Sequence, residues 1–302
     1  MQAVALSRRL FLLAAIFAYL QIALGGVVRV SGSGLGCPDW PLCHGRPYPP
    51  ANVNSIIEYS HRTVGAITGV LIIAAVVAAW AVYRQRRPAV AWVATAALAA
   101  VAVEGGLGGI VVASELTPWL VAVHLGLAMI ILGGLIATAV VSLPESRGGG
   151  DDRFLRLAWS TVAATYVLLL TGSSVVATSA DESCNSLPLC GGGLVPDFSG
   201  VNAFTMLHRG SALLVGILIV VFAVAAYRRG LRFAAVAAIA LLALQAAVGA
   251  AAAMSDAALA NGAHVALATL VWSAVLSTAL LAFPRADRVE HSAPMQVQKT
   301  PV

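Results

Sequence analysis

The sequence predicts an all-α integral membrane protein whose eight transmembrane helices form two pseudo-twofold-related four-helix bundles. Of the 302 residues, 60% are hydrophobic and only 10% are charged, whereas about a quarter of the residues of a soluble domain are charged. The mean hydropathy is +0.89, and apolar runs long enough to cross a bilayer recur along the whole chain. An internal repeat, described below, divides these runs into two sets of four.

The apolar runs place the membrane-spanning helices. We expect them at residues 11–30, 61–83, 90–112, 119–142, 154–178, 208–227, 232–253 and 262–283. The first run follows Arg8 and Arg9 and superficially resembles a signal peptide. It is too long for one, and no small-residue cleavage site precedes a soluble domain, so we interpret it as the first helix.

The basic residues predict the orientation, because lysine and arginine concentrate in cytoplasmic loops. Of the 18 basic residues, 14 lie before the first helix, after the last, or in the connections that share their side of the membrane. We therefore expect cytoplasmic N and C termini in a multi-pass protein of the cell membrane. The same bias accounts for the net charge of +5, so no nucleic-acid partner is needed.

The chain contains an internal duplication. Its clearest marks are Cys37, Cys43, His61 and Arg62, which recur 147 positions later as Cys184, Cys190, His208 and Arg209. "EYSHR" corresponds to "TMLHR", and His124 corresponds to His264 at an offset of 140. Each copy has four spans, and an even number makes the copies parallel, related by an axis along the membrane normal.

The duplication sets the expected domains. Residues 1–143 form the N-terminal four-helix half and residues 154–283 the C-terminal half. The polar segment 144–153 is predicted to be a cytoplasmic linker, and residues 284–302 a disordered cytoplasmic tail.

Four of the six histidines lie at the starts of helices that run from the outer side inward. They are His61, His124, His208 and His264, two in each half and all at a similar depth. A polar side chain within the membrane is costly and usually functional. One such histidine often only bonds to a neighbouring helix, but four at matched positions favour two bis-histidine haem sites. Zinc or copper is the weaker alternative, because no intramembrane carboxylate and thiol set completes four ligands.

Three arginines lie near the outer boundary. Arg62 and Arg209 directly follow their histidines, and Arg29 ends the first helix. Each is either an interfacial side chain that reaches toward water or a cationic partner for haem propionates. The position equivalent to Arg29 is Val176, so that contact would exist in one half only.

The halves differ in their acidic residues. Glu58 precedes His61 by three residues and shares a helical face with it, whereas the equivalent residue is Thr205. A carboxylate beside a haem ligand can orient water or accept a proton; the alternative is an interfacial pair with Arg62. Glu104 aligns with Gln245, and interhelical hydrogen bonding or a proton route would explain it.

All four cysteines fall in the two long outer loops, with five residues between the members of each pair. "CPDWPLCHGR" does not match the C-x-x-C-H signature of covalent haem attachment, and the position matching His44 is a glycine, which disfavours zinc. In an oxidising compartment we expect the disulfides Cys37–Cys43 and Cys184–Cys190. Such short loops gain roughly 2–2.5 kcal/mol in the chain-entropy model. A redox role is the alternative to a structural one.

Together these motifs resemble the haem A synthases of bacteria and mitochondria. The resemblance covers nearly the whole chain, from the first helix to the eighth. It is carried by "GGVVRVSGSGLGCPDWPLC" at 25–43, "EYSHR" at 58–62, "VHLGLA" around His124, "HRG" at 208–210, His264 and the cysteine pairs.

The resemblance implies that His208 and His264 hold haem b as a cofactor, while His61 and His124 receive the substrate haem O. The enzyme would oxidise the C8 methyl of haem O to a formyl group by successive hydroxylations, giving haem A for cytochrome c oxidase. Glu58 matches a glutamate that the family ties to catalysis. The implied partners are haem O, membrane lipid, a haem O synthase and the assembly of cytochrome c oxidase, with a homo-oligomer left open.

Two other functions fit parts of the pattern. A di-haem b-type cytochrome that transfers electrons between quinol and an outer-side acceptor explains the four histidines but not the asymmetry at Glu58. A duplicated transporter with metal-binding histidines is the third interpretation, and a haem absorption band would exclude it.

Overall fold

The computed structural model describes residues 2–85, 87–143, 150–184, 186–190, 195–255 and 257–283. The predicted tail and residues 144–149 of the predicted linker lie outside these ranges. The helices of the described residues are α1 (Gln2–Val30), α2 (Val53–Tyr83), α3 (Pro88–Ala113), α4 (Pro118–Val141), α5 (Asp152–Ala177), α6 (Ala180–Ser183), α7 (Asn202–Arg228), α8 (Arg232–Met254) and α9 (Ala258–Ala282). All except α6 are long and apolar enough to cross a membrane, so the eight predicted spans are confirmed.

Three of the spans begin well before their apolar runs, and the first of them, α1, starts at Gln2 rather than at residue 11. α2 starts at Val53 rather than at residue 61, because the Asn52 side chain accepts hydrogen bonds from the backbone N–H groups of Asn54 and Ser55. α7 likewise starts at Asn202 rather than at residue 208. These polar extensions place Glu58 and Thr205 inside regular helix, one turn before the histidines.

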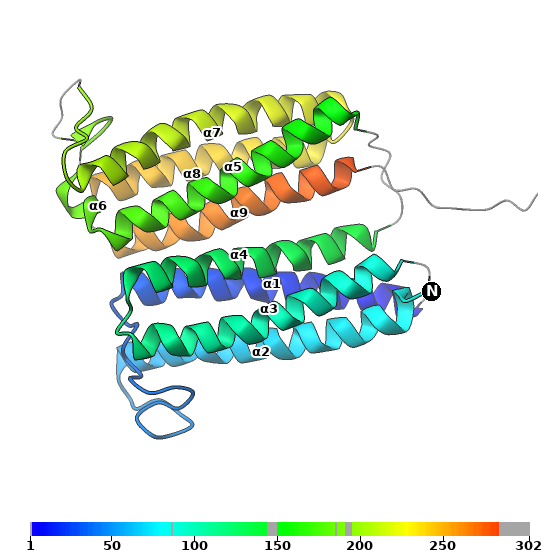
Figure 1. Ribbon diagram of the computed structural model, residues 1–302, viewed down its shortest axis with the longest axis horizontal. Helices are drawn as coiled ribbons and strands as arrows, with labels where there is room; N and C mark the ends of the chain where they lie inside the picture. The colour runs from blue at the N-terminus through cyan, green and yellow to red at the C-terminus, as the bar shows by residue number, and fades with distance from the viewer. Residues whose placement is uncertain are drawn as a thin grey trace, which may run out of the picture.

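The long helices form two groups that lie side by side (Figure 1). In the first group, α1 and α3 each pack against both α2 and α4. In the second group, α5 and α8 each pack against both α7 and α9. Each group therefore closes as a four-helix bundle, and α6 is a short turn in the connection between α5 and α7.

The two groups meet through α1 and α4 on one side and α5 and α9 on the other. Small residues bring the backbones close: a Cβ built on Gly26 would lie 3.4 Å from Val265 of α9, and one on Gly133 would lie 2.7 Å from the Trp272 ring. The Tyr166 hydroxyl donates to the Gly126 carbonyl at 3.0 Å and ties α5 to α4. One hydrophobic core consequently runs through both groups.

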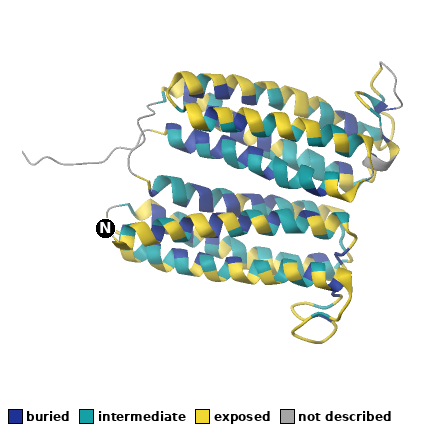
Figure 2. Ribbon diagram, turned by 180° about the vertical axis from the view of Figure 1, so that it is seen from behind, coloured by how far each residue is buried: buried dark blue, intermediate teal, exposed yellow. Residues whose placement is uncertain are grey.

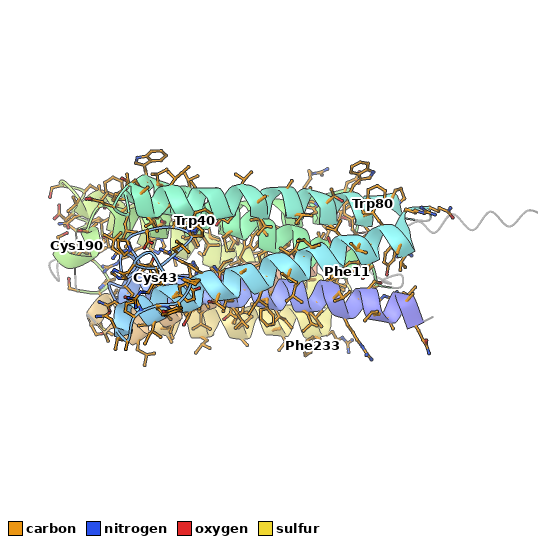
Figure 3. All side chains as sticks on the ribbon, turned by 90° about the horizontal axis from the view of Figure 1, so that it is seen from below. Phe11, Trp40, Cys43, Trp80, Cys190 and Phe233 are labelled. Carbon is orange, nitrogen blue, oxygen red and sulfur yellow. A yellow bond between two sulfur atoms is a disulfide. The ribbon has the colours of Figure 1, made fainter. Side chains whose placement is uncertain are left out.

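Buried residues gather between the helices, and the outer faces are exposed and apolar (Figure 2). Phe233 is 89% exposed and Leu259 is 86% exposed, and Figure 3 shows Phe233 pointing away from the helices, whereas Phe11 lies among them. Water would not tolerate such a continuous apolar surface, but lipid does. The protein is therefore a multi-pass membrane protein.

Both cysteine-containing loops lie at one end of the molecule (Figure 1). The N-terminus and the connections that follow α2 and α7, which contain Arg84, Arg87 and Arg229, lie at the opposite end. The helices that carry the four histidines, α2, α4, α7 and α9, all begin at the end with the cysteine loops.

Candidate functional site

Each of the four histidines lies against a glycine of the helix that precedes its own. The glycines are Gly25 of α1, Gly108 of α3, Gly172 of α5 and Gly249 of α8. A Cβ built on them would lie 3.2, 3.4, 3.0 and 2.8 Å, in that order, from the Cε1 atoms of His61, His124, His208 and His264. The glycines thus leave room for the rings between the helices, a signal that the sequence analysis missed.

The structure brings the histidines together as two pairs, one in each bundle. His61 of α2 and His124 of α4 lie close enough to interact electrostatically, and so do His208 of α7 and His264 of α9. Within the described ranges, no group of three or more His, Cys, Asp or Glu side chains is placed to hold a metal ion alone. A pair of imidazoles suits a metal whose other ligands come from a macrocycle, so these residues fit haem.

In the C-terminal bundle, neutral groups contact both histidines at Nδ1. The Thr171 hydroxyl lies 3.0 Å from Nδ1 of His208. The Gln245 amide nitrogen lies 3.1 Å from Nδ1 of His264 and farther, at 3.4 Å, from its Nε2. Both rings are thus held by side chains of neighbouring helices, chiefly through Nδ1.

The N-terminal bundle differs at both histidines. Nε2 of His61 lies 3.2 Å from the Gln21 amide, and its buried Nδ1 has no hydrogen-bond partner among the described residues. Nδ1 of His124 lies 3.0 Å from Oε1 of Glu104, although the two atoms are not aligned as a hydrogen bond. The interhelical contact suggested for Glu104 and Gln245 is therefore present in both halves, with an acid in one and an amide in the other.

Glu58 is buried and joins two structural elements. Its Oε1 lies 2.5 Å from Nη2 of Arg62, and its Oε2 accepts a 2.7 Å hydrogen bond from the backbone N–H of Cys37. The pair with Arg62 is thus present. Thr205, the equivalent residue, donates to the Ala180 carbonyl at 3.2 Å, so the second half has no buried acid at this position.

The two arginines hold the cysteine loops. Arg62 donates to the carbonyls of Asp39 at 2.6 Å, Leu42 at 2.5 Å and Cys37 at 2.7 Å. Arg209 donates to those of Ser186 at 2.7 Å, Pro188 at 3.1 Å and Cys184 at 3.1 Å. Neither alternative considered from the sequence included this arginine clamp. Arg29, by contrast, is exposed at the end of α1.

Each loop is closed by a disulfide. Cys37 bonds to Cys43 and Cys184 to Cys190, with Cα atoms 4.6 and 4.8 Å apart. In the first loop Trp40 lies over α3, because a Cβ on Gly109 would be 3.2 Å from its indole ring. The loop therefore folds back over the N-terminal bundle near Glu58 (Figure 3).

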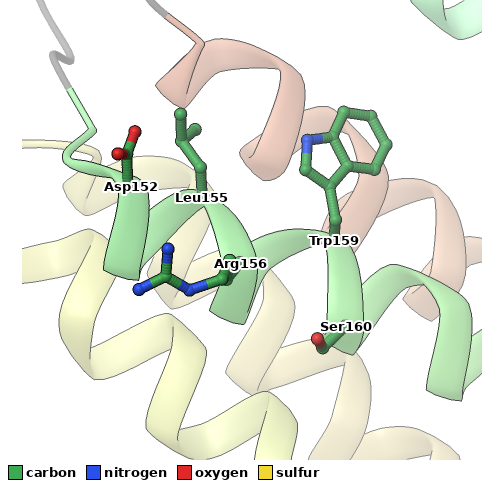
Figure 4. Close-up of a pocket in the computed structure, with 5 residues that line it drawn as sticks. All are labelled: Asp152, Leu155, Arg156, Trp159 and Ser160. Carbon is green, nitrogen blue, oxygen red and sulfur yellow. The ribbon is translucent and has the colours of Figure 1, made fainter.

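Two surface cavities lie away from the four paired histidines. One of about 430 Å³ is lined by Asp152, Leu155, Arg156, Trp159 and Ser160 at the start of α5 (Figure 4). The other, of about 400 Å³, is lined by residues of the first loop and of the start of α2, His44 among them. Neither cavity includes one of the four paired histidines, so neither is part of the candidate site.

Comparisons with known proteins agree with this site. The family model described as "cytochrome oxidase assembly protein" matches residues 8–56 and 51–276. The haem A synthase of Symbiobacterium thermophilum is 31% identical over 247 residues, which are 76% of this chain and 80% of the relative. That of Bacillus licheniformis is 30% identical over 223 residues, 70% and 73% of the two chains, and that of Alkalihalophilus pseudofirmus is 30% identical over 205 residues, 65% and 68%.

Proposed function

We propose that this chain, which belongs to the haem A synthase family of cytochrome oxidase assembly proteins, oxidises the C8 methyl of haem O to a formyl group and so makes haem A. The observation that carries the proposal is the asymmetry between two histidine pairs of the same design. The side chains that contact the C-terminal pair, Thr171 and Gln245, are neutral, whereas the N-terminal pair has a buried carboxylate, Glu58, and a half-buried one, Glu104, nearby. A pure electron-transfer cytochrome would leave this asymmetry unexplained.

The partners of the histidines support assigning haem b to His208 and His264. Thr171 contacts His208 at Nδ1, and Gln245 contacts His264 more closely at Nδ1 than at Nε2, so these contacts fix the ring orientations chiefly through Nδ1. A pair oriented in advance suits a permanent cofactor. Haem b, when bound, supplies one-electron redox chemistry to the protein.

His61 and His124 are better suited to the substrate, haem O. Nε2 of His61 is engaged by Gln21, so the ring has to leave this contact before that nitrogen can bind iron. A ligand that exchanges a protein partner for iron fits a site whose occupant enters as haem O and leaves as haem A.

Glu58 is the proposed catalytic residue. It stands one turn before His61 at the end of the bundle that the first loop covers, where it can orient water or accept a proton as the methyl group is oxidised. With water as the oxygen source, oxidation of the methyl to the alcohol and then to the formyl group releases two electrons and two protons in each step. The electrons must pass to an external acceptor, and a carboxylate near the methyl can accept a proton. A low-polarity environment increases the effect of such a carboxylate.

The arginines differ as propionate partners. All four N–H bonds of the Arg62 terminal nitrogens are used by Glu58 and the loop carbonyls, whereas those of Arg209 make three hydrogen bonds to described residues and leave one without a partner among them. We therefore propose Arg209 as the better donor to a propionate. Arg62 would first have to release Glu58 or the loop, and the exposed Arg29 remains a candidate.

We further propose that the bundles are related by a pseudo-twofold axis along the membrane normal, because their helices pack in the same order. Cytoplasmic termini in the cell membrane, with the disulfide loops outside, follow from the arginine-rich connections at the opposite end. A haem O synthase would supply the substrate, and the product would enter cytochrome c oxidase assembly. A homo-oligomer remains open.

Substitution of Glu58 tests the function. The protein would be co-expressed with a haem O synthase and its haems extracted. We expect the wild type to yield haem A, and Glu58→Gln to retain the haem b spectrum while haem O or its alcohol accumulates. Thr205→Val, the matched change in the other half, should leave the yield of haem A unchanged. Normal haem A from Glu58→Gln would overturn the role of Glu58, and its absence from the wild type would overturn the function.

A further inference from the structure

The two bundles place different groups beside equivalent histidines. In the C-terminal bundle the side chain next to His264 is the amide of Gln245, a residue of α8. In the N-terminal bundle the side chain next to His124 is the carboxylate of Glu104, from α3. The two positions correspond in the repeat, each four residues before the glycine that faces its histidine. The bundles therefore differ by one charge at the same place.

Apart from His124, few polar groups of the described residues contact the Glu104 side chain. Its side chain is 12% exposed, Oε1 lies 3.0 Å from Nδ1 of His124, and Oε2 is buried without a hydrogen-bond partner among the described residues. A carboxylate inside a membrane helix is costly unless another group compensates for it. Among the described residues, the imidazole N–H of His124, 3.0 Å away, is the group placed to do so.

We propose that Glu104 is a positioning residue that makes His124 a stronger iron ligand than His264. Accepting a hydrogen bond from Nδ1–H, the carboxylate would hold the ring with Nε2 toward the bundle interior and increase the electron density on that nitrogen. The proposal rests on the proposed function, because it takes His124 to be a haem ligand.

The physical basis is the influence of a group behind an iron ligand. A carboxylate fixes the tautomer of a coordinating histidine and raises its basicity, and a more basic axial ligand favours the oxidised state of the iron. The Gln245 amide can fix the ring but carries no charge. The site in the N-terminal bundle should thus have the lower reduction potential, which is the direction that would let electrons pass from this site to the haem of the C-terminal bundle.

A reciprocal exchange tests the inference. In the purified holoprotein, Glu104→Gln should raise the reduction potential of one haem and leave the other unchanged. Gln245→Glu should lower the potential of the second haem. The component that His264→Ala removes identifies the haem of the C-terminal bundle. Since each exchange installs the residue found at the equivalent position of the other half, both variants should fold.

A third variant separates charge from orientation. Glu104→Leu removes the hydrogen bond as well as the charge, and we expect the N-terminal site to lose about 10- to 100-fold in haem affinity. Glu104→Gln should retain most of that affinity. Unchanged potentials in both exchanged variants, or equal shifts of both haems in either one, would overturn the inference. Haem A production by the wild type is scored separately, so failure of the proposed function would be recognised by itself.

Discussion

The four histidine rings occupy space that four glycines leave open. Gly249 is the tightest case, because a Cβ there would lie 2.8 Å from Cε1 and 3.1 Å from Nδ1 of His264. Contacts under 3.0 Å force something to move, and a ring that Gln245 also contacts cannot move without losing that partner. The glycines are therefore part of the proposed haem-binding site although they would contribute no ligand.

Gly249→Ala should displace His264 and reduce the amount of haem b bound per polypeptide. The added methyl group overpacks the site, at a cost of about 1–3 kcal/mol. Haem content and the absorption spectrum of the purified protein measure the effect. Gly216→Ala in α7 is the control, because nothing lies within 4 Å of its Cβ, and it should be neutral or slightly stabilising. Equal haem loss in both variants would show that the contact with His264 is not the cause.

At the level of elements, α2 and α7 extend beyond their apolar runs and carry the residues that hold the cysteine loops. Arg62 and Arg209 make corresponding bonds to the loop carbonyls. Among the side chains that the structure describes, Arg62 also pairs with a buried acid, Glu58, with side-chain exposures of 13% and 4%, and Arg209 has no such acid. The arginine of the N-terminal half thus has an additional electrostatic role, because it also pairs with Glu58.

This difference predicts unequal effects of one substitution. Arg62→Gln should cost about 3–5 kcal/mol, because it leaves the Glu58 charge buried without its partner. Arg209→Gln should cost less, about 1–3 kcal/mol for the lost hydrogen bonds. Thermal unfolding in detergent gives the order of stabilities.

The double variant Glu58→Gln/Arg62→Gln serves as the control for that comparison. It removes both charges and should regain much of the stability lost in Arg62→Gln. If Arg62→Gln and Arg209→Gln were equally stable, the destabilisation assigned to the unpaired Glu58 charge would be wrong.

Apolar runs predicted the membrane-spanning part of every long helix but not the starts of α1, α2 and α7. The polar residues 53–60 are helical because Asn52 caps them and the loop packs on them, and neither cause is visible in hydropathy. The paired histidines could be found because the chain is duplicated. Gln21 and Thr171 could not, since they occupy unequal positions in the repeat and only the helix packing brings them to the rings.

On the scale of the whole molecule, the bundles share one core in which α1 and α4 meet α5 and α9. Trp272 fills the space beside Gly133 and donates to the Val162 carbonyl at 3.3 Å, which fixes its ring. The sequence predicted two bundles but not this docking, because small and apolar residues face lipid and protein alike. The interface depends on shape rather than on polarity.

Alanine substitutions at two adjacent glycines test the interface. Gly133→Ala places a methyl group 2.7 Å from the Trp272 ring and should lower stability by about 1–3 kcal/mol. Gly134→Ala meets only Ala97, at 3.7 Å, within its own bundle and should be tolerated. The onset of aggregation on heating, followed by size-exclusion chromatography, compares the two. A lower onset for Gly134→Ala would contradict the proposed contact between the bundles.

The bond between Glu58 and the backbone of Cys37 has a consequence for biogenesis. Arg62 of α2 and the backbone N–H of Cys37, in the loop closed by the disulfide, both hold the carboxylate. Closing the loop therefore fixes one of the two partners of Glu58. A newly inserted chain whose thiols are still reduced would have its helices and histidines but would lack this fixed contact, so the disulfide links the surroundings of the acid to thiol oxidation.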